Sequence, residues 1–112
     1  MDITKPTAEV FDRLAIHPDR LAEFCQKWQA IELAVFGSVL TDRFRADSDL
    51  DFLVTFAPQS KISLLGLVQM EEELSELLGR SVDLLTRQSV KEDANWLRRT
   101  EILKTARTIY EP

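Results

Sequence analysis

Two aspartates one residue apart, Asp49 and Asp51, lie at the head of an apolar run within VFGSVLTDRFRADSDLDFLVTF, residues 35–56. Carboxylates this close together repel each other, so a cation is their natural partner. Hard divalent ions such as Mg²⁺ are bound by a few carboxylates together with the oxygens of substrate phosphates. The pattern therefore indicates a metal site at the start of the run at 50–56.

Strand periodicity places the two carboxylates on one face, about 6 to 7 Å apart along the chain. A third carboxylate, Asp83, lies inside another apolar run at 81–86. Turn chemistry explains Asp47 well, but it explains Asp51 and Asp83 poorly because Asp is disfavoured inside strands. We favour a shared metal site formed by Asp49, Asp51 and Asp83; the alternative is that the three acids are unrelated.

Gly37 and Ser38 directly follow the apolar run at 31–36. A glycine lets the backbone turn tightly beside a ligand, and a serine that opens a short helix offers a hydroxyl and free N–H groups to a phosphate. The same pair is also common as a simple helix cap, but the acids downstream favour phosphate binding. Arg43 and Arg45 are nearby cations for that phosphate, or else ordinary solvent-exposed charges.

Hydrophobic periodicity predicts the elements that must position these residues. Apolar runs rich in β-branched and aromatic residues predict strands at 31–36, 50–56 and 81–86. Helical spacing of apolar residues predicts helices within 7–15, 17–29, 63–80 and 95–110. Pro18 suits the first turn of its helix, and Gly79 suits a C-terminal cap. The predicted fold is α+β, a small mixed β-sheet packed by helices, in one domain over residues 1–112.

Composition limits the possible partners. With 14 basic and 19 acidic residues the net charge is −5, which argues against a general nucleic-acid binder, so we expect no direct nucleic-acid substrate. No run approaches the roughly 20 apolar residues of a membrane span. The start of the chain, MDITKPTAEVF, lacks a secretory pattern, so we expect a cytoplasmic protein. The single Cys25 lies in a helical pattern and is expected to be buried and inert.

The stretch GSVLTDRFRADSDLDFLV resembles the G-S-x(n)-S-D-x-D signature of the nucleotidyltransferase superfamily that includes DNA polymerase β. The short chain resembles the minimal nucleotidyltransferase (MNT) proteins, and the resemblance covers nearly its whole length. It implies a nucleotidyltransferase fold in which Gly37 and Ser38 contact the triphosphate of ATP. It also implies that Asp49 and Asp51 bind Mg²⁺, while Asp83 completes the metal site and assists the attacking hydroxyl.

Basic residues often follow the Gly-Ser pair in this family. Here Val39 and Thr41 occupy two such places, which leaves Arg43 and Arg45 as the nearby cations. Arg43 is therefore the candidate for contact with the phosphates.

MNT proteins are commonly the antitoxins of HEPN-domain toxins, which are RNases, and some transfer AMP to a tyrosine of that partner. The resemblance thus implies a Mg²⁺-dependent enzyme that transfers AMP from ATP to a partner protein. One alternative is a catalytically weak or inactive protein of the same fold that neutralises its partner by stoichiometric binding. Another is an accessory domain that completes the site of a larger transferase. Turnover separates these possibilities.

Overall fold

A four-stranded mixed sheet forms the centre of the computed structural model, which describes residues 7–112. Its strands are β1 (Ala30–Phe36), β2 (Leu50–Phe56), β3 (Val82–Thr86) and β4 (Arg107–Tyr110). The spatial order is β3-β2-β1-β4. β1 runs antiparallel to both β2 and β4, whereas β2 and β3 are parallel. The predicted α+β fold with a small mixed sheet is confirmed.

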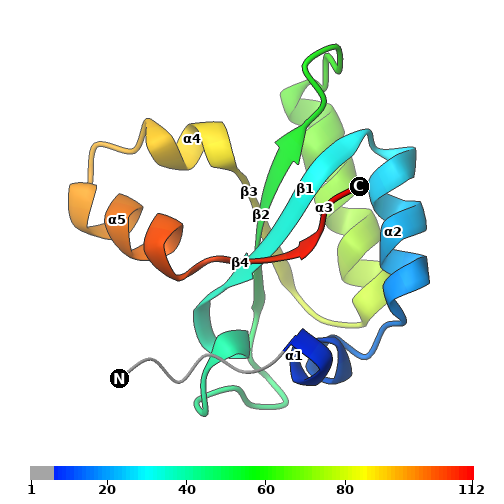
Figure 1. Cartoon of the computed structure of the whole chain (residues 1–112), viewed down its shortest axis with the longest axis vertical. Helices are drawn as coiled ribbons and strands as arrows, with labels where there is room; N and C mark the ends of the chain where they lie inside the picture. The colour runs from blue at the N-terminus through cyan, green and yellow to red at the C-terminus, as the bar shows by residue number, and fades with distance from the viewer. Residues whose placement is uncertain (1–6) are drawn as a thin grey trace.

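Helices cover both faces of this sheet (Figure 1). They are α1 (Thr7–Leu14), α2 (Pro18–Lys27), α3 (Leu64–Leu78), α4 (Arg87–Lys91) and α5 (Trp96–Thr105). The 3₁₀ turn η1 (Gly37–Leu40) follows β1 directly. α2 and α3 lie on one face of the sheet, and α4 and α5 lie on the other (Figure 1).

The alternation of side chains along β2 divides the apolar residues between two cores. Leu50, Phe52 and Val54 are fully buried in the larger core, beneath the helices that precede β3. Leu53 points the opposite way and packs in a smaller core with residues such as Ile102 of α5. Because Asp51 lies between Leu50 and Phe52 in the chain, it shares the face of Leu53 and therefore the side of the sheet that α5 covers.

Local sequence signals account for the ends of the helices. α2 begins at Pro18, and the Nδ1 atom of His17 accepts a hydrogen bond of 3.1 Å from the Asp19 amide. Ser63 caps α3 in the same way, by accepting a hydrogen bond of 3.0 Å from the Gly66 amide. Gly79 ends α3 with φ at 68°, a left-handed conformation that glycine adopts without strain. The predictions for Pro18 and Gly79 are confirmed.

The predicted helix over 95–110 is confirmed for residues 96–105 and wrong for residues 106–110. α5 ends at Thr105, and the chain then turns at Ala106 (φ −57°, ψ 138°) into β4. β4 pairs with the open edge of β1, and Ile109 and Tyr110 pack against the larger core from this strand rather than from a helix. Pairing with β1 and burial of Ile109 and Tyr110 stabilise the strand more than the helical spacing of apolar residues would stabilise a helix. The short helix α4 was not predicted.

Two expectations from composition can be compared with the structure. Cys25 is fully buried, and burial raises the pKa of its thiol to about 12, so the predicted inert cysteine is confirmed. Within residues 7–112, every helix is too short or too polar to cross a bilayer.

The central position of Phe52 predicts a large effect on stability. Phe52→Ala should lower the free energy of unfolding by about 3 to 5 kcal/mol, since it removes a fully buried ring and leaves a cavity. Ile31→Ala on β1 is the control, because 39% of Ile31 is exposed. Urea denaturation followed by circular dichroism measures both. Similar losses in the two variants would contradict the assignment of Phe52 to the main core.

Candidate active site

The parallel pairing of β2 and β3 places Asp51 and Asp83 side by side. The two residues are register partners on adjacent strands, which lie about 4.8 Å apart. Side chains of register partners point to the same face of a sheet. Asp49 immediately precedes β2, and its charge also acts on Asp51. The structure therefore brings the charges of all three predicted aspartates into one region at the start of these strands.

The partly buried Asp51 shows the electrostatic effect of this arrangement. Burial raises the pKa of its carboxyl to about 6, and repulsion from Asp83 and then from Asp49 adds to the shift. The positive charge of Arg98, on α5, opposes it. A cation that approaches this carboxyl would stabilise its ionised form.

The turn at Gly37 lies directly against Asp51. Gly37 has φ at 81°, where side chains other than glycine are strained. A Cβ atom added there would overlap with the Oδ2 atom of Asp51. Glycine is thus required both for the turn and for the close approach of the backbone to the carboxylate. The Gly37 turn therefore lies beside Asp51, although 13 residues separate the two in the sequence.

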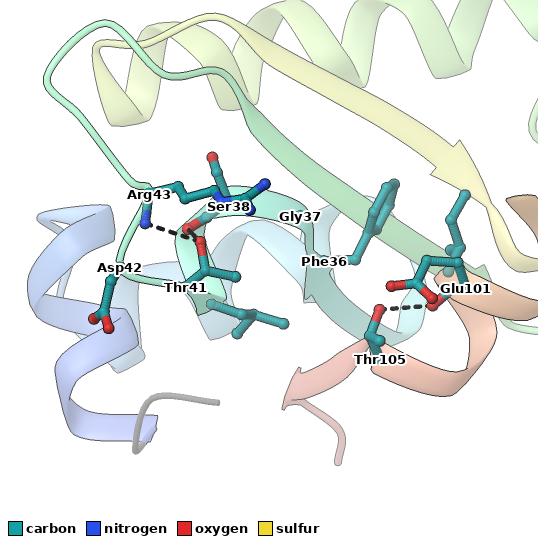
Figure 2. Close-up of a pocket in the computed structure, with 10 residues that line it drawn as sticks. Phe36, Gly37, Ser38, Thr41, Asp42, Arg43, Glu101 and Thr105 are labelled. Atoms are coloured by element: carbon teal, nitrogen blue, oxygen red, sulfur yellow. Dashed lines mark hydrogen bonds between the residues drawn. The ribbon is translucent and has the colours of Figure 1, made fainter. Parts of the chain in front are cut away.

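A pocket of about 610 Å³ opens between this turn and α5 (Figure 2). Gly37, Ser38 and Arg43 line one side of it, and Glu101 and Thr105 line the other. Phe36, Leu40 and Ile102 supply apolar surface. The volume is within the range of pockets for small ligands. All three residues predicted to contact the nucleotide therefore line one pocket, whereas Arg45 is exposed and lies outside its lining.

Carboxylate oxygens are the ligands that a hard divalent cation prefers, and the charges of Asp83 and Asp49 both act on Asp51. Within residues 7–112, no three Asp, Glu, His or Cys side chains converge closely enough to surround an ion by themselves. Mg²⁺ commonly takes only one or two protein carboxylates, and phosphate oxygens and water complete its shell. A site of this kind needs the phosphates of a ligand to complete the metal shell. The Gly37-Ser38 turn lies next to Asp51, where its N–H groups could bind such phosphates.

Arg98 was not identified from the sequence. It lies on α5, its Nη1 atom is 3.9 Å from Oδ2 of Asp93, and its charge acts on Asp51 across the site. The only signal was the excess of basic residues between positions 87 and 107. That excess could not single out Arg98, because only the packing of α5 against the sheet brings it to the carboxylates.

The raised pKa of Asp51 predicts a pH-dependent effect of Asp51→Asn. The folded carboxyl has a pKa of about 6 against an ordinary 3.8, so its ionised form destabilises the fold. This destabilisation is complete above about pH 6 and absent below about pH 3.8. In a chelating buffer, Asp51→Asn should raise the melting temperature at pH 8 more than at pH 4.

Asp47→Asn is the matched control, because Asp47 is exposed in the loop before β2. It should change the melting temperature little at either pH. An equal gain from Asp51→Asn at pH 4 and pH 8 would show that the carboxylate is not under electrostatic stress.

The sequence also matches known proteins. The Thermococcus cleftensis protein adenylyltransferase MntA is 37% identical over 83 residues, which are 74% of this chain and 79% of that protein. A solved structure described as a candidate minimal nucleotidyltransferase is 31% identical, with a TM-score of 0.65 over 87% of this chain and 93% of that one.

Two more distant structures share the fold. A chain from a toxin-antitoxin structure with AMP-PNP has a TM-score of 0.67 at 14% identity, over 87% of this chain and 75% of that one. A chain from the complex of a tri-AMPylated Shewanella oneidensis HEPN toxin with its MNT antitoxin has a TM-score of 0.61 at 13% identity, over 88% and 73%. The family model described as a nucleotidyltransferase domain matches residues 20–109. This chain therefore belongs to the nucleotidyltransferase domain family.

Proposed function

We propose that this protein transfers AMP from ATP to a hydroxyl of a partner protein in a Mg²⁺-dependent reaction. We further propose that the partner is a HEPN-type RNase toxin, modified on a tyrosine, and that the protein acts as its antitoxin. The observation that carries the proposal is the contact of the Gly37 turn with Asp51, which is itself paired with Asp83. A phosphate-binding turn beside paired carboxylates suits metal-assisted phosphoryl chemistry.

The known relatives support the same reaction class. The Thermococcus protein is named a protein adenylyltransferase. One structural neighbour is a toxin-antitoxin structure with AMP-PNP, and another contains a HEPN toxin that carries three AMP groups beside an MNT antitoxin. AMP transfer to a HEPN partner is therefore the reaction that we infer for this chain.

The transfer is an in-line displacement at the α-phosphorus of ATP. The partner's hydroxyl oxygen bonds to phosphorus, the bond to the bridging oxygen of pyrophosphate breaks, and the hydroxyl proton passes to a carboxylate. Asp83 is the candidate acceptor, because it is exposed to an incoming partner and adjacent to Asp51. When bound, Mg²⁺ stabilises the negative charge on the attacking and leaving oxygens.

Each end of the site has a separate task in this reaction. The Gly37 and Ser38 amides and the Ser38 hydroxyl bind the phosphates at the start of η1. Arg43 lines the same pocket and would neutralise the leaving pyrophosphate. Asp49 and Asp51 would hold the ion.

The start of α5 offers a surface for the partner. Trp96 is 61% exposed and Leu97 is 64% exposed, although large apolar side chains usually favour burial. Later residues of the same helix, Glu101 and Thr105, line the pocket. A partner that covers Trp96 and Leu97 would bring its acceptor hydroxyl close to the bound nucleotide.

The proposal predicts an AMP adduct on the partner. The protein is incubated with ATP, Mg²⁺ and the product of the neighbouring gene, where that gene encodes a HEPN-like protein. Intact-mass spectrometry should show an AMP-sized increase in the partner. The increase should disappear in the Asp49→Asn/Asp51→Asn double variant, because the ion would lose its ligands.

Suppose that the protein inhibits its partner without forming an adduct, and that the double variant inhibits equally well. This result would contradict the proposed AMP transfer and favour neutralisation by stoichiometric binding. An Asp47→Asn variant serves as the control, since it changes an exposed loop carboxylate without touching the paired strands.

The turn itself yields a second prediction. Gly37→Ala should reduce affinity for Mg²⁺ and AMP-PNP by about tenfold or more, since the methyl group would displace Asp51 and strain the turn. Gly66→Ala in α3 is the control, because its methyl group would meet Ile62 and Ser63 rather than the site. Isothermal calorimetry measures both affinities. Equal affinities in the two variants would show that the turn does not bind the triphosphate.

A further inference from the structure

The loop over residues 41–49 joins the phosphate turn to the first carboxylate. It contains no helix or strand, and its internal bonds are local turns, such as the hydrogen bond of 3.1 Å from the Ser48 amide to the Arg45 carbonyl. No ladder of backbone hydrogen bonds fixes its path. Its shape sets how Ser38 at one end lies relative to Asp49 at the other. A reaction that needs an ion and a triphosphate in fixed geometry depends on that relation.

Arg80, just after α3, holds the second half of this loop. Its Nη1 atom donates hydrogen bonds of 3.0 Å to the carbonyl oxygens of Arg45, Ala46 and Ser48. Its Cζ atom lies 4.4 Å from the centre of the Phe44 ring. One guanidinium group therefore contacts four loop residues.

Arg13, at the end of α1, holds the first half. Its Nη1 atom donates hydrogen bonds to the carbonyl oxygens of Val39 at 3.1 Å and Thr41 at 2.5 Å. The Cζ atom of Arg13 lies 5.3 Å from the centre of the same Phe44 ring. Its Nη2 atom forms an ion pair with Oε2 of Glu9 at 3.5 Å. Two arginines that are far apart in the chain thus meet at one aromatic residue of the loop.

The chemistry of these contacts specifically suits arginine. A guanidinium group is planar, so it donates in its plane to several carbonyl oxygens while its face lies against an aromatic ring. A lysine ammonium carries the charge but has no planar face, and its nitrogen lies one bond short of the position that Nη1 of an arginine reaches. Replacement by lysine therefore keeps the positive charge and removes the combined hydrogen bonds and ring contact.

The contacts of Arg80 go to the loop and not to the core. The start of β2 has its own anchor, since the Leu50 amide donates a hydrogen bond of 2.9 Å to the Ser81 carbonyl. Both cores consist of other residues, apart from Phe44, which packs at the edge of the larger one. Loss of the Arg80 contacts should therefore change the loop more than the global fold.

We propose that Arg13 and Arg80 are positioning residues for nucleotidyl transfer, which clamp the 41–49 loop so that the Gly37-Ser38 turn and the Asp49-Asp51 carboxylates engage one metal-bound triphosphate. The inference rests on the proposed function. Neither arginine touches the reacting atoms; both act through the backbone of the loop.

The test compares the wild type with Arg80→Lys, Arg80→Ala and Arg13→Lys in the full chain. Arg20→Ala on α2 is the control, because Arg20 is exposed and lies outside the loop. Hydrogen exchange of the amides of residues 42–49 is measured first, in metal-free buffer. Calorimetry then gives the affinity for AMP-PNP with Mg²⁺ and with a chelator.

In the clamp variants, the loop amides should exchange about tenfold faster, as the loss of charge-assisted hydrogen bonds predicts. Amides of β2 should keep their protection. Affinity for AMP-PNP with Mg²⁺ should fall about tenfold, whereas affinity in chelator should stay within about twofold. Arg80→Lys should behave like Arg80→Ala, because a lysine side chain is one bond too short to keep the three carbonyl contacts of Nη1 and has no planar face for the Phe44 ring.

Several outcomes would overturn the inference. Unchanged loop exchange in Arg80→Lys would show that the arginine does not hold the loop. Faster loop exchange with intact Mg²⁺-dependent affinity would show that the clamp does not position the site, and a parallel loss of β2 protection would mark a purely structural role. A wild-type protein that binds AMP-PNP equally with and without Mg²⁺ would instead contradict the proposed function, and the inference with it.

Discussion

The partly buried carboxyl of Asp51, which also feels the charges of Asp83 and Asp49, is the constraint on which the rest of the candidate site depends. Parallel pairing of β2 and β3 fixes Asp51 and Asp83 as neighbours. Burial first, and then repulsion from Asp83 and Asp49, raises the pKa of the Asp51 carboxyl to about 6. A cation beside Asp51 would stabilise its ionised form and offset this repulsion. The turn at Gly37, pressed against Asp51, supplies the place where a phosphate could join that cation.

The fold serves this arrangement from both faces of the sheet. The larger core fixes β1 and β2 through Leu33 and Phe52, and the smaller core seats α5 against the opposite face through Ile102. α5 then closes the pocket opposite the turn and brings the charge of Arg98 to Asp51. The candidate site therefore lies beside both cores and next to the 41–49 loop, whose carbonyl oxygens accept hydrogen bonds from Arg13 and Arg80.

Sequence reasoning could predict the parts of the site that follow from local patterns. The strand at 50–56 follows from alternation, and Gly37 follows from its place after an apolar run. The tertiary contributions could not be predicted in this way. Residues 107–110 carry a helical pattern, but pairing with the edge of β1 makes them a strand. Arg13, Arg80 and Arg98 lie outside any motif, because only the packed fold brings them to the loop and the carboxylates.

A crystal structure of the protein with AMP-PNP and Mn²⁺ would locate the ion directly, because Mn²⁺ reports its position by anomalous scattering. We expect a metal peak about 2 Å from carboxylate oxygens of Asp49 and Asp51, with Asp83 beside it and the triphosphate against the Gly37-Ser38 turn. A nucleotide bound away from that turn, or an ion that contacts none of the three aspartates, would contradict this arrangement.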